Sequence, residues 1–411
     1  MKLIRDPVHG YIEVPDNILA IVSHPLFQRL RYIKQTALAY MVYPGMTHTR
    51  FEHSLGAMHL ALEFSKYIKE NSDLKYLDKT LMELIATAGL LHDIGHLPFS
   101  HTFESALTLA KGVYGMDVPD NGKKTHVKIG IKLISEGIPD IIEKKFSDQG
   151  DPVKFLVNVL SESPSSDEER LASLIISNFI DADRGDYLLR DSYYAGVGYG
   201  RFDIERLKRF LYLKRGTIAV LRKALPIVEQ FLLARMYMFE NVYFHSVVGL
   251  YNAILTQAII ELLQKGKIKI PEEPGEFLSF DDNYILHQLR SVRSELRDAV
   301  LYRKGYKRVK LNATQSCYEQ IQGMKNELYS EMVSSRGLFV FHEFNDVPYR
   351  EEKDEAVYII DKGEIERLRE VSPLIRSLSE IRNFVIGYHD SYSKEAERYV
   401  KTLQECITLG P

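Results

Sequence analysis

The feature that most constrains this chain is the dipeptide His92-Asp93, which directly follows the apolar run Ala86–Leu91. An ionisable pair at the end of an apolar helix-like stretch is a poor core element, whereas both side chains are good metal ligands. A second histidine, His53, lies upstream, and a second aspartate lies downstream in the run Asp181-Ala-Asp183-Arg-Gly-Asp186. Two imidazoles and two carboxylates would form a mixed nitrogen and oxygen site for a divalent ion that activates water. The chain must then fold so that these four residues meet.

Length and composition place the chain among globular proteins. With 411 residues it buries enough surface to need no covalent staples. Its two cysteines, Cys317 and Cys406, are far apart, which predicts neither a disulfide framework nor a cysteine-ligated zinc site and fits a reducing cytosol. The first ten residues carry charges where a signal peptide would be apolar, and no run approaches the roughly 18 to 20 apolar residues of a membrane span. We therefore expect a soluble cytoplasmic protein with no membrane partner.

The net charge of −3 gives no general attraction to nucleic acid, so any anion site must be local. This balance excludes a protein that binds nucleic acid through overall positive charge.

Hydrophobic periodicity predicts a mainly α protein. Thr49-x-x-Glu52 resembles a capping box that starts a helix running to about Lys69, residues 79–93 form a second helix, and residues 221–264 form a long helical stretch. Pro271-Glu-Glu-Pro-Gly is the clearest linker by composition. After it, helices alternate with short β-rich runs at 338–341 and 356–360. We expect a helical bundle over residues 1–265 that holds the chemistry, and an accessory α+β region of unknown role over 276–411.

The four candidate ligands lie in different predicted helices, and a bundle can direct such side chains into one central cavity. Imidazole combined with carboxylate suits one divalent ion of manganese, iron, nickel or zinc better than calcium, and magnesium is a further candidate. The alternative for His53 is an ordinary helix histidine, and for His92-Asp93 a helix end cap.

Longer motifs around these residues resemble a known family. His53, His92-Asp93 and Asp183 match the H…HD…D signature of the HD superfamily of metal-dependent phosphohydrolases. The closest resemblance is to the branch that holds the deoxynucleoside triphosphate triphosphohydrolases, and it covers about residues 2–250. The motifs that carry it are Asp6-Pro-Val-His-Gly, Phe27-Gln-Arg-Leu-Arg-Tyr-Ile-Lys-Gln, His48-Thr-Arg-Phe-Glu-His-Ser-Leu-Gly, His92-Asp-Ile-Gly-His-Leu-Pro-Phe-Ser-His and Asp183-Arg-Gly-Asp-Tyr-Leu-Leu-Arg-Asp. The resemblance implies an HD-domain bundle in residues 1–265.

Three more histidines, His96, His101 and His126, are candidates for proton transfer or for holding a phosphate oxygen, because imidazole titrates near neutrality. Glu104 follows His101 by three residues, a helical spacing that lets the carboxylate orient the imidazole. A surface ion pair is the alternative. The resemblance implies that His101 and Glu104 are the catalytic pair and that His96 and His126 contact the phosphates.

Arginine suits bidentate recognition of phosphate, and aromatic rings suit packing against a sugar. By resemblance, the phosphate-binding arginines are Arg50, Arg184 and Arg235. Four further positions match residues around the deoxyribose in the family: Gln35, Tyr187, Asp191 and Tyr243. A tyrosine packed on the 2′ edge of the sugar would exclude a 2′-hydroxyl. Core packing is the alternative for each aromatic residue.

A candidate activator site is matched only in part. Lys2, Gln28 and Arg31 match activator-site positions of the family, and Arg5 replaces an asparagine. The aspartate that reads guanine in the mammalian branch aligns with Ser23, and a neutral hydroxyl cannot accept the paired donors of guanine as a carboxylate can. Because this motif lies at subunit contacts in the family, the resemblance implies a homo-oligomer, a dimer or a tetramer, with a nucleotide activator.

The motifs and the resemblance together predict a metal-dependent, dGTPase-like enzyme that cleaves a deoxynucleoside triphosphate to deoxynucleoside and triphosphate. One alternative is another HD hydrolase, such as a nucleotidase or phosphodiesterase. The other is a non-catalytic protein that binds nucleotides or single-stranded nucleic acid.

Overall fold

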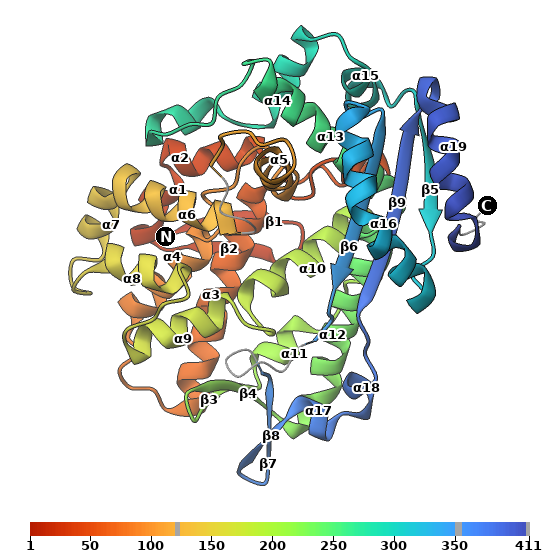
Figure 1. The fold of residues 1–411 in the computed structure, drawn as a ribbon. Coiled ribbons are helices and arrows are strands. Elements are labelled where there is room, and N and C mark those ends of the chain that lie inside the picture. Colours follow the sequence, from red (N-terminus) through yellow and green to blue (C-terminus); the bar gives the residue numbers. More distant parts are fainter. Residues whose placement is uncertain (120–123, 350–355, 408–411) are drawn as a thin grey trace.

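A computed structural model describes residues 1–119, 124–349 and 356–407. The first half of the chain folds into helices around a small hairpin (Figure 1). Its elements are β1 (Lys2–Asp6), β2 (Gly10–Val14), α1 (Asp16–Val22), α2 (Pro25–Gln28), α3 (Arg50–Ser72), α4 (Lys79–Leu91), α5 (His101–Gly112), α6 (Thr125–Lys132), α7 (Pro139–Lys145), α8 (Pro152–Leu160), α9 (Asp167–Ile176) and α10 (Ala182–Ala195).

The second half adds strands to helices. Its elements are α11 (Ile204–Lys208), β3 (Leu211–Lys214), β4 (Thr217–Leu221), α12 (Leu225–Met238), α13 (Ser246–Gln264), α14 (Asp282–Ser291), α15 (Glu295–Tyr302), β5 (Tyr306–Leu311), α16 (Gln315–Ser334), β6 (Phe339–Asp346), β7 (Tyr358–Asp361), β8 (Glu364–Arg367), α17 (Leu368–Val371), α18 (Pro373–Arg376), β9 (Ile381–His389) and α19 (Ser393–Thr402). The expected fold class, a mainly helical protein with a C-terminal α+β part, is confirmed.

Helix α3 is the centre of the bundle and contacts both α4 and α10. It begins as the sequence predicts, because the backbone N–H of Thr49 donates to the Glu52 carboxylate at 2.6 Å in a capping box. It ends at Asp73, whose φ of 49° is left-handed. Most of its length is buried, so its side chains line the interior of the bundle.

Three small sheets follow the order β1-β2, β3-β4-β7-β8 and β5-β9-β6. The pairing of β4 with β7 is parallel, and it joins the chain before residue 265 to the chain after 276. Strand β9 is antiparallel to both β5 and β6, and α13 lies between this sheet and helix α5 (Figure 1). The expected boundary at 265–276 stays a prediction, although sheet pairing crosses it.

The long helical stretch expected over 221–264 is interrupted. Helix α12 runs into a π-helical turn at Phe239–Tyr243, and α13 then starts with the His245 ring accepting from the backbone of Val247. Helix α13 has 19 residues and a mean hydropathy of 1.5, so it reaches the length and apolar composition of a membrane span, which corrects the expectation that no segment does. Its apolar window is 78% buried inside the protein, as in the core helix of a globular fold.

The two cysteines are paired, which corrects the expectation drawn from their separation. Cys317 and Cys406 form a disulfide across 89 residues, with Cα atoms 5.5 Å apart. An isolated bridge between Leu311 and Ile407 brings the C-terminal segment beside the start of α16. Separation along the sequence was therefore a poor guide to cysteine pairing, because the bridge between Leu311 and Ile407 brings the two segments together.

The segment expected to be a linker is ordered against the bundle. Pro274–Ser279 forms a 3-10 helix that contacts α2, and Phe277 within it is buried. This part of the chain connects two regions while also covering the core.

Candidate functional site

The four predicted metal ligands converge. His53 comes from α3, His92 and Asp93 directly follow α4, and Asp183 is in the first turn of α10. The Nε2 atom of His53 lies 3.3 Å from Nε2 of His92 and 3.1 Å from Oδ1 of Asp183. The Asp93 carboxylate lies 3.5 Å from the first imidazole and 3.3 Å from the second. Three helices thus direct nitrogen and oxygen atoms to one point.

The chemistry of these donors fits a divalent ion. The Nδ1 atom of His53 bonds to Asp186 at 2.8 Å, and Nδ1 of His92 bonds to the carbonyl of Gly89 at 2.8 Å. These bonds fix the tautomer in which each Nε2 keeps its lone pair for a metal. Without an ion, burial opposes the charging of His53, but hydrogen bonds to Asp183 and Asp186 outweigh it and raise its pKa to about 10, so a bound ion would replace the proton on Nε2.

Asp186 organises the buried charges behind this point. Its oxygens accept from His9 at 2.7 Å, from His53 at 2.8 Å and twice from Arg190 at 2.9 Å. Burial raises its pKa, but the Arg190 charge and these hydrogen bonds hold the pKa well below its usual range. A Cβ on Gly56 would lie 1.8 Å from an Asp186 oxygen, so only glycine fits beside it.

The predicted catalytic pair is in contact. Nδ1 of His101 bonds to one Glu104 oxygen at 2.8 Å, and the other oxygen accepts from Nδ1 of His126 at 2.7 Å. The rings of His96 and His126 stack with centroids 4.2 Å apart. Burial raises the pKa of Glu104, but the hydrogen bonds to the two histidines lower it more, so it stays a carboxylate. The arrangement leaves Nε2 of His101 available to exchange a proton.

The loop between Asp93 and His101 is held from two sides. The buried guanidinium of Arg29 donates to the carbonyls of Ile94 and His96, each at 2.9 Å. Asp282 accepts from the backbone of Phe99 at 2.7 Å, and Phe99 and Ser100 both have a φ of 55°. Two successive left-handed residues other than glycine persist only where the surroundings enforce them, often at functional sites.

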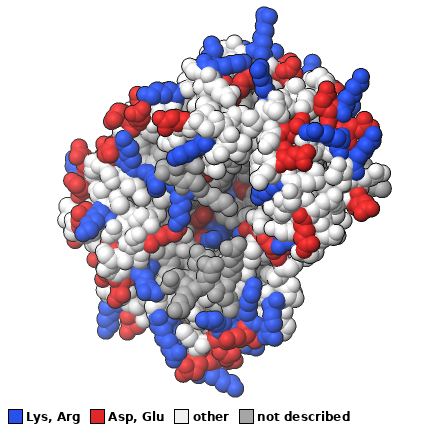
Figure 2. Space-filling view, in the orientation of Figure 1, with Lys and Arg blue, Asp and Glu red and all other residues white. Residues whose placement is uncertain are grey.

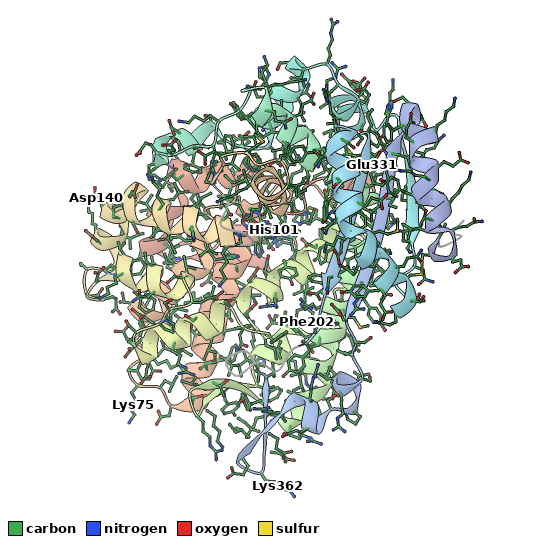
Figure 3. All side chains as sticks on the ribbon, viewed as in Figure 1. Lys75, His101, Asp140, Phe202, Glu331 and Lys362 are labelled. Atoms are coloured by element: carbon green, nitrogen blue, oxygen red, sulfur yellow. A yellow bond between two sulfur atoms is a disulfide. The ribbon has the colours of Figure 1, made fainter. Side chains whose placement is uncertain are left out.

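A cavity of about 420 Å³, here called the histidine cavity, opens beside these groups. Figure 2 shows this face of the molecule hollowed near its centre, where Figure 3 labels His101. Its lining includes the predicted residues Gln35, Arg50, His92, Asp93, His96, His101, His126, Asp183, Tyr187, Asp191 and Tyr243.

Several buried polar atoms in this lining have no hydrogen-bond partner among the described residues. They are Oε1 of Gln35, Oγ1 of Thr36, Nδ1 of His96 and Oδ1 of Asn252. An unpaired buried polar group is costly. These atoms therefore favour a polar ligand or water in the histidine cavity.

Asp191 is held in the wall by two neighbours. The Tyr243 hydroxyl donates to it at 2.7 Å, and the His48 imidazole lies 2.6 Å from its other oxygen. The ring centroids of Tyr187 and Tyr243 are 6.3 Å apart, edge to face. The positions that match sugar-contacting residues of the family therefore form one surface.

The three predicted phosphate-binding arginines have different surroundings. Arg50 lines the histidine cavity and donates to Asp93 and, at 2.6 Å, to Ser100. Arg184 instead donates to Asp181 and to the carbonyl of Asn178. Neither it nor Arg235 is part of the cavity lining.

Arg235 forms a bidentate ion pair with Asp346 at the end of β6, with distances of 2.6 and 2.8 Å. Its guanidinium also lies 4.4 Å from the ring centroid of Phe239. The sequence could not show this pairing, because Asp346 is 111 residues away.

The candidate activator residues form two separate groups in one chain. Arg31 donates to Gln28 at 2.8 Å and lies over the Phe51 ring, whereas Arg5 stacks on Tyr11. Among the described residues no hydrogen bond or ion pair joins Lys2 or Arg5 to the other two. The Ser23 hydroxyl donates to the carbonyl of Leu19.

Sequence reasoning missed the residues that support this site. They are His9, Arg29, His48, Ser100, Asp186, Arg190, Asn252 and Asp282. Several of them lie within the sequence motifs that resemble the HD family. A charged residue inside such a motif was the one signal that could have indicated a supporting role.

Comparison with known proteins agrees with this geometry. The HD domain family model matches residues 50–184, and the HD associated region model matches 202–387. An uncharacterised protein of Methanocaldococcus jannaschii is 33% identical over 97% of this chain and 81% of its own length. A deoxynucleoside triphosphate triphosphohydrolase homologue of Dictyostelium discoideum is 30% identical over 74% of this chain, which spans 59% of that protein.

Two solved structures are similar along nearly the whole chain. A hypothetical protein of Aquifex aeolicus has a TM-score of 0.79 and 30% identity, covering 97% of this chain and 99% of its own. A phosphohydrolase of Bacteroides thetaiotaomicron has a TM-score of 0.73 and 25% identity, covering 94% and 99%. With the H…HD…D residues gathered beside a histidine-lined cavity, this chain belongs to the HD superfamily of phosphohydrolases.

Proposed function

We propose that this protein hydrolyses deoxynucleoside triphosphates, dGTP among them, to deoxynucleoside and triphosphate. The observation that carries the proposal is the juxtaposition of two clusters beside one cavity. His53, His92, Asp93 and Asp183 form the first, and His96, His101, Glu104 and His126 form the second; all but His53 and Glu104 line the cavity. The similarity to a deoxynucleoside triphosphate triphosphohydrolase homologue supports this substrate class.

His53, His92, Asp93 and Asp183 would hold one divalent ion, manganese, iron, nickel, zinc or magnesium. When bound, such an ion polarises a phosphate oxygen and lowers the pKa of water. Arg50 adds a fixed positive charge in the cavity wall. Burial and the nearby Arg50 charge lower the pKa of His96, so this ring is neutral. Its Nε2 lies 3.2 Å from the Asp93 carboxylate, which leaves the unpartnered Nδ1 as an acceptor for a water molecule or a hydroxyl of the substrate.

In the reaction a water oxygen bonds to the α-phosphorus while the bond from phosphorus to the 5′-oxygen breaks. The leaving 5′-oxygen needs a proton. His101 is placed to donate it from Nε2, because Glu104 holds Nδ1 and stabilises the charged ring. The water gives up a proton to solvent, so the products are a neutral deoxynucleoside and triphosphate.

Selection for deoxyribose belongs to the same proposal. Tyr187 and Tyr243 line the cavity, and Asp191 is held beside them by the Tyr243 hydroxyl. A ring packed on the 2′ edge excludes a 2′-hydroxyl, while the Asp191 carboxylate accepts from the 3′-hydroxyl. Gln35 adds an unpartnered amide oxygen for the sugar.

Three further points remain part of the proposal. The protein assembles as a homodimer or homotetramer, it takes a nucleotide activator through Lys2, Arg5, Gln28 and Arg31, and it is cytoplasmic. Since no hydrogen bond or ion pair among the described residues joins Arg5 to Gln28 or Arg31, we expect a second copy of the chain to complete the activator site.

The test is incubation of the purified protein with each deoxynucleoside triphosphate and manganese or magnesium, with and without a second nucleotide, followed by chromatography. Deoxynucleoside and triphosphate in equal amounts are expected. Orthophosphate or pyrophosphate as the product would contradict the proposal and favour another HD hydrolase. Binding without any product would favour a nucleotide sensor.

The metal ligands are tested by His92→Ala and Asp93→Ala. Each is expected to lose bound metal, measured by elemental analysis, and to lower turnover at least a thousandfold. His287→Ala is the control, because His287 is on α14 and is not part of the cavity lining. Full metal content and turnover in either ligand variant would refute the assignment.

A further inference from the structure

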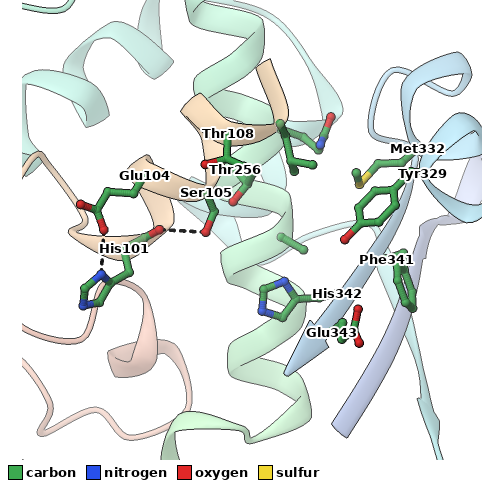
Figure 4. Close-up of a pocket in the computed structure, with 13 residues that line it drawn as sticks. His101, Glu104, Ser105, Thr108, Thr256, Tyr329, Met332, Phe341, His342 and Glu343 are labelled. Carbon is green, nitrogen blue, oxygen red and sulfur yellow. Dashed lines mark hydrogen bonds and ion pairs between the residues drawn. The ribbon is translucent and has the colours of Figure 1, made fainter. Parts of the chain in front are cut away.

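A second cavity of about 480 Å³ lies on the other side of the catalytic pair, between helix α5 and the C-terminal sheet. We call it the α5–β6 cavity. Figure 4 shows His101, Glu104 and Ser105 on one wall and Tyr329, Met332, Phe341 and His342 on the opposite wall. Helix α13 forms its floor with Ala253, Thr256 and Gln257. The two cavities thus share His101 but are otherwise lined by different residues, and Glu104 lines only the α5–β6 cavity.

The α5–β6 cavity differs from the histidine cavity in charge. Its described lining contains no lysine or arginine. Glu343, the acidic residue that β6 contributes to the lining, is already paired with Lys325 at 2.6 Å. Burial lowers the pKa of His342 to about 4, although the nearby Glu343 acts in the opposite direction. That ring is therefore neutral at physiological pH, with one donor and one acceptor nitrogen. A phosphate would find no fixed positive charge here.

Apolar atoms make up most of the lining surface, although nine of the thirteen lining residues carry a polar group, a mixture that suits a small organic molecule. Tyr329, Met332 and Phe341 supply ring and thioether surface on one side, and Leu109 and Ala253 supply aliphatic surface. Surfaces of this kind suit a flat heterocycle better than a flexible chain.

The described wall contains one buried hydrogen-bond donor without an acceptor, the side-chain amide of Gln257. The Tyr114 hydroxyl donates to its Oε1, which fixes the amide and leaves Nε2 facing away from Tyr114. Gln257 is 3% exposed, and Nε2 has no partner among the described residues. Leaving a buried donor unpaired costs about 1–3 kcal/mol, which a carbonyl or ring nitrogen of a ligand would offset.

We propose that the α5–β6 cavity binds an uncharged nucleoside or nucleobase, with an acceptor on Gln257 and the ring against Tyr329, Met332 and Phe341. The ligand would contact the same helix that carries His101 and Glu104. Its occupancy would then restrict the His101 ring and slow turnover. That regulatory consequence rests on the proposed function, in which a deoxynucleoside is the product, whereas the binding itself does not.

The experiment is calorimetric titration of the full chain with deoxyguanosine and deoxyadenosine, the free bases guanine and adenine, and the corresponding 5′-monophosphates. No turnover is needed, so a failure of the proposed activity does not affect it. The nucleosides or bases are expected to bind at least tenfold more tightly than the monophosphates. Comparison of the affinities for nucleoside and free base shows which of the two is the preferred ligand.

Two variants locate the binding. Gln257→Leu removes the donor, and Thr108→Trp fills the mouth with a ring from the exposed side of α5; each is expected to weaken binding at least tenfold. Gln264→Leu is the matched control, because Gln264 is exposed at the end of the same helix outside the cavity, and it should change binding less than twofold. Melting curves check that each variant is folded.

Tyr243→Ala separates the two cavities, because Tyr243 lines only the histidine cavity. Binding that survives in this variant and is lost in Gln257→Leu supports the proposal. The reverse pattern would place the nucleoside in the histidine cavity and overturn it. So would the absence of binding by the unaltered protein at millimolar nucleoside.

Discussion

Asp186 is the residue on which the buried charges of the bundle depend. It is fully buried, it orients the His53 ring, and it neutralises Arg190, which also bonds to Asp6 at 2.9 Å. The hairpin β1-β2 reaches the same carboxylate through His9. One side chain therefore connects the N-terminal hairpin, α3 and α10.

Asp186→Asn should destabilise the protein by about 3 to 5 kcal/mol, because it leaves the buried Arg190 without one of its two carboxylates. Metal affinity should fall roughly 10- to 100-fold, since the His53 ring loses its charged partner. Urea unfolding and metal titration measure the two effects. Asp140→Asn, on the exposed surface of α7, is the control (Figure 3). Equal stability of the two variants would contradict this role.

The same carboxylate gives a pH dependence. Its pKa is lowered in the folded state, so its stabilising contribution is present above the unfolded pKa of about 3.9 and is lost as the pH falls below that value. The stability difference between the unaltered protein and Asp186→Asn should therefore shrink below about pH 4.

Residue types and spacings indicated a site of two histidines and two carboxylates and a His101–Glu104 contact. The resemblance to the HD signature singled out Asp183 among three nearby aspartates and implied the catalytic role of the pair. Neither predicted that Arg235 pairs with Asp346 or that Arg184 bonds to Asp181. An arginine in a motif indicates a partner of negative charge, but the sequence does not show whether that partner is a ligand or a carboxylate.

At the scale of elements, the position of α6 depends on a close approach at Gly95. A Cβ there would lie 2.1 Å from the carbonyl oxygen of His126 and 2.2 Å from the backbone nitrogen of Gly130. Both obstacles are backbone atoms, so they cannot rotate away. Helix α6 carries His126, whose backbone and ring both bond to Glu104.

Gly95→Ala should push α6 outward, break the bonds between His126 and Glu104, and lower turnover roughly a hundredfold, since misplacement by about 1 Å has that order of effect. Gly130→Ala is the matched control, because its Cβ would meet no atom closer than 3.6 Å, and it should keep most of the activity. Steady-state kinetics of the two variants are compared. Similar loss in both would exclude this explanation.

Helices with clear caps were predicted well, and the β-rich runs at 338–341 and 356–360 overlap β6 and β7, but other short strands were missed. The capping box at Thr49 gave the start of α3, whereas β3, β5 and β9 carry no distinctive pattern and depend on partners far away in the chain. The break between α12 and α13 was also missed, because both flanks are apolar and the interruption is a π-helical turn rather than a proline.

At the scale of the whole molecule, the C-terminal region is closed by the bridge between Cys317 and Cys406. It joins the start of α16 to the segment after α19, so it encloses β6 and β9 in one loop of the chain. A crosslink over a long loop stabilises mainly by restricting the unfolded chain.

Cys406→Ser should lower the free energy of unfolding by about 2 to 4 kcal/mol. The change should appear as faster hydrogen exchange in β5 and α16, while metal content stays the same because the ligands belong to the bundle. Cys317→Ser and the double variant should show the same loss, since all three remove one crosslink. A larger loss in the double variant would mean that the two thiols stabilise the fold separately.

The ion pair between Arg235 and Asp346 has a practical consequence for dissecting this protein. A fragment that ended near residue 265 would lack Asp346, which is the only bidentate counterion of the Arg235 guanidinium among the described residues. Such a fragment would have an arginine without its counterion, a defect that results from the truncation itself. Its inactivity would say nothing about whether the removed half takes part in chemistry.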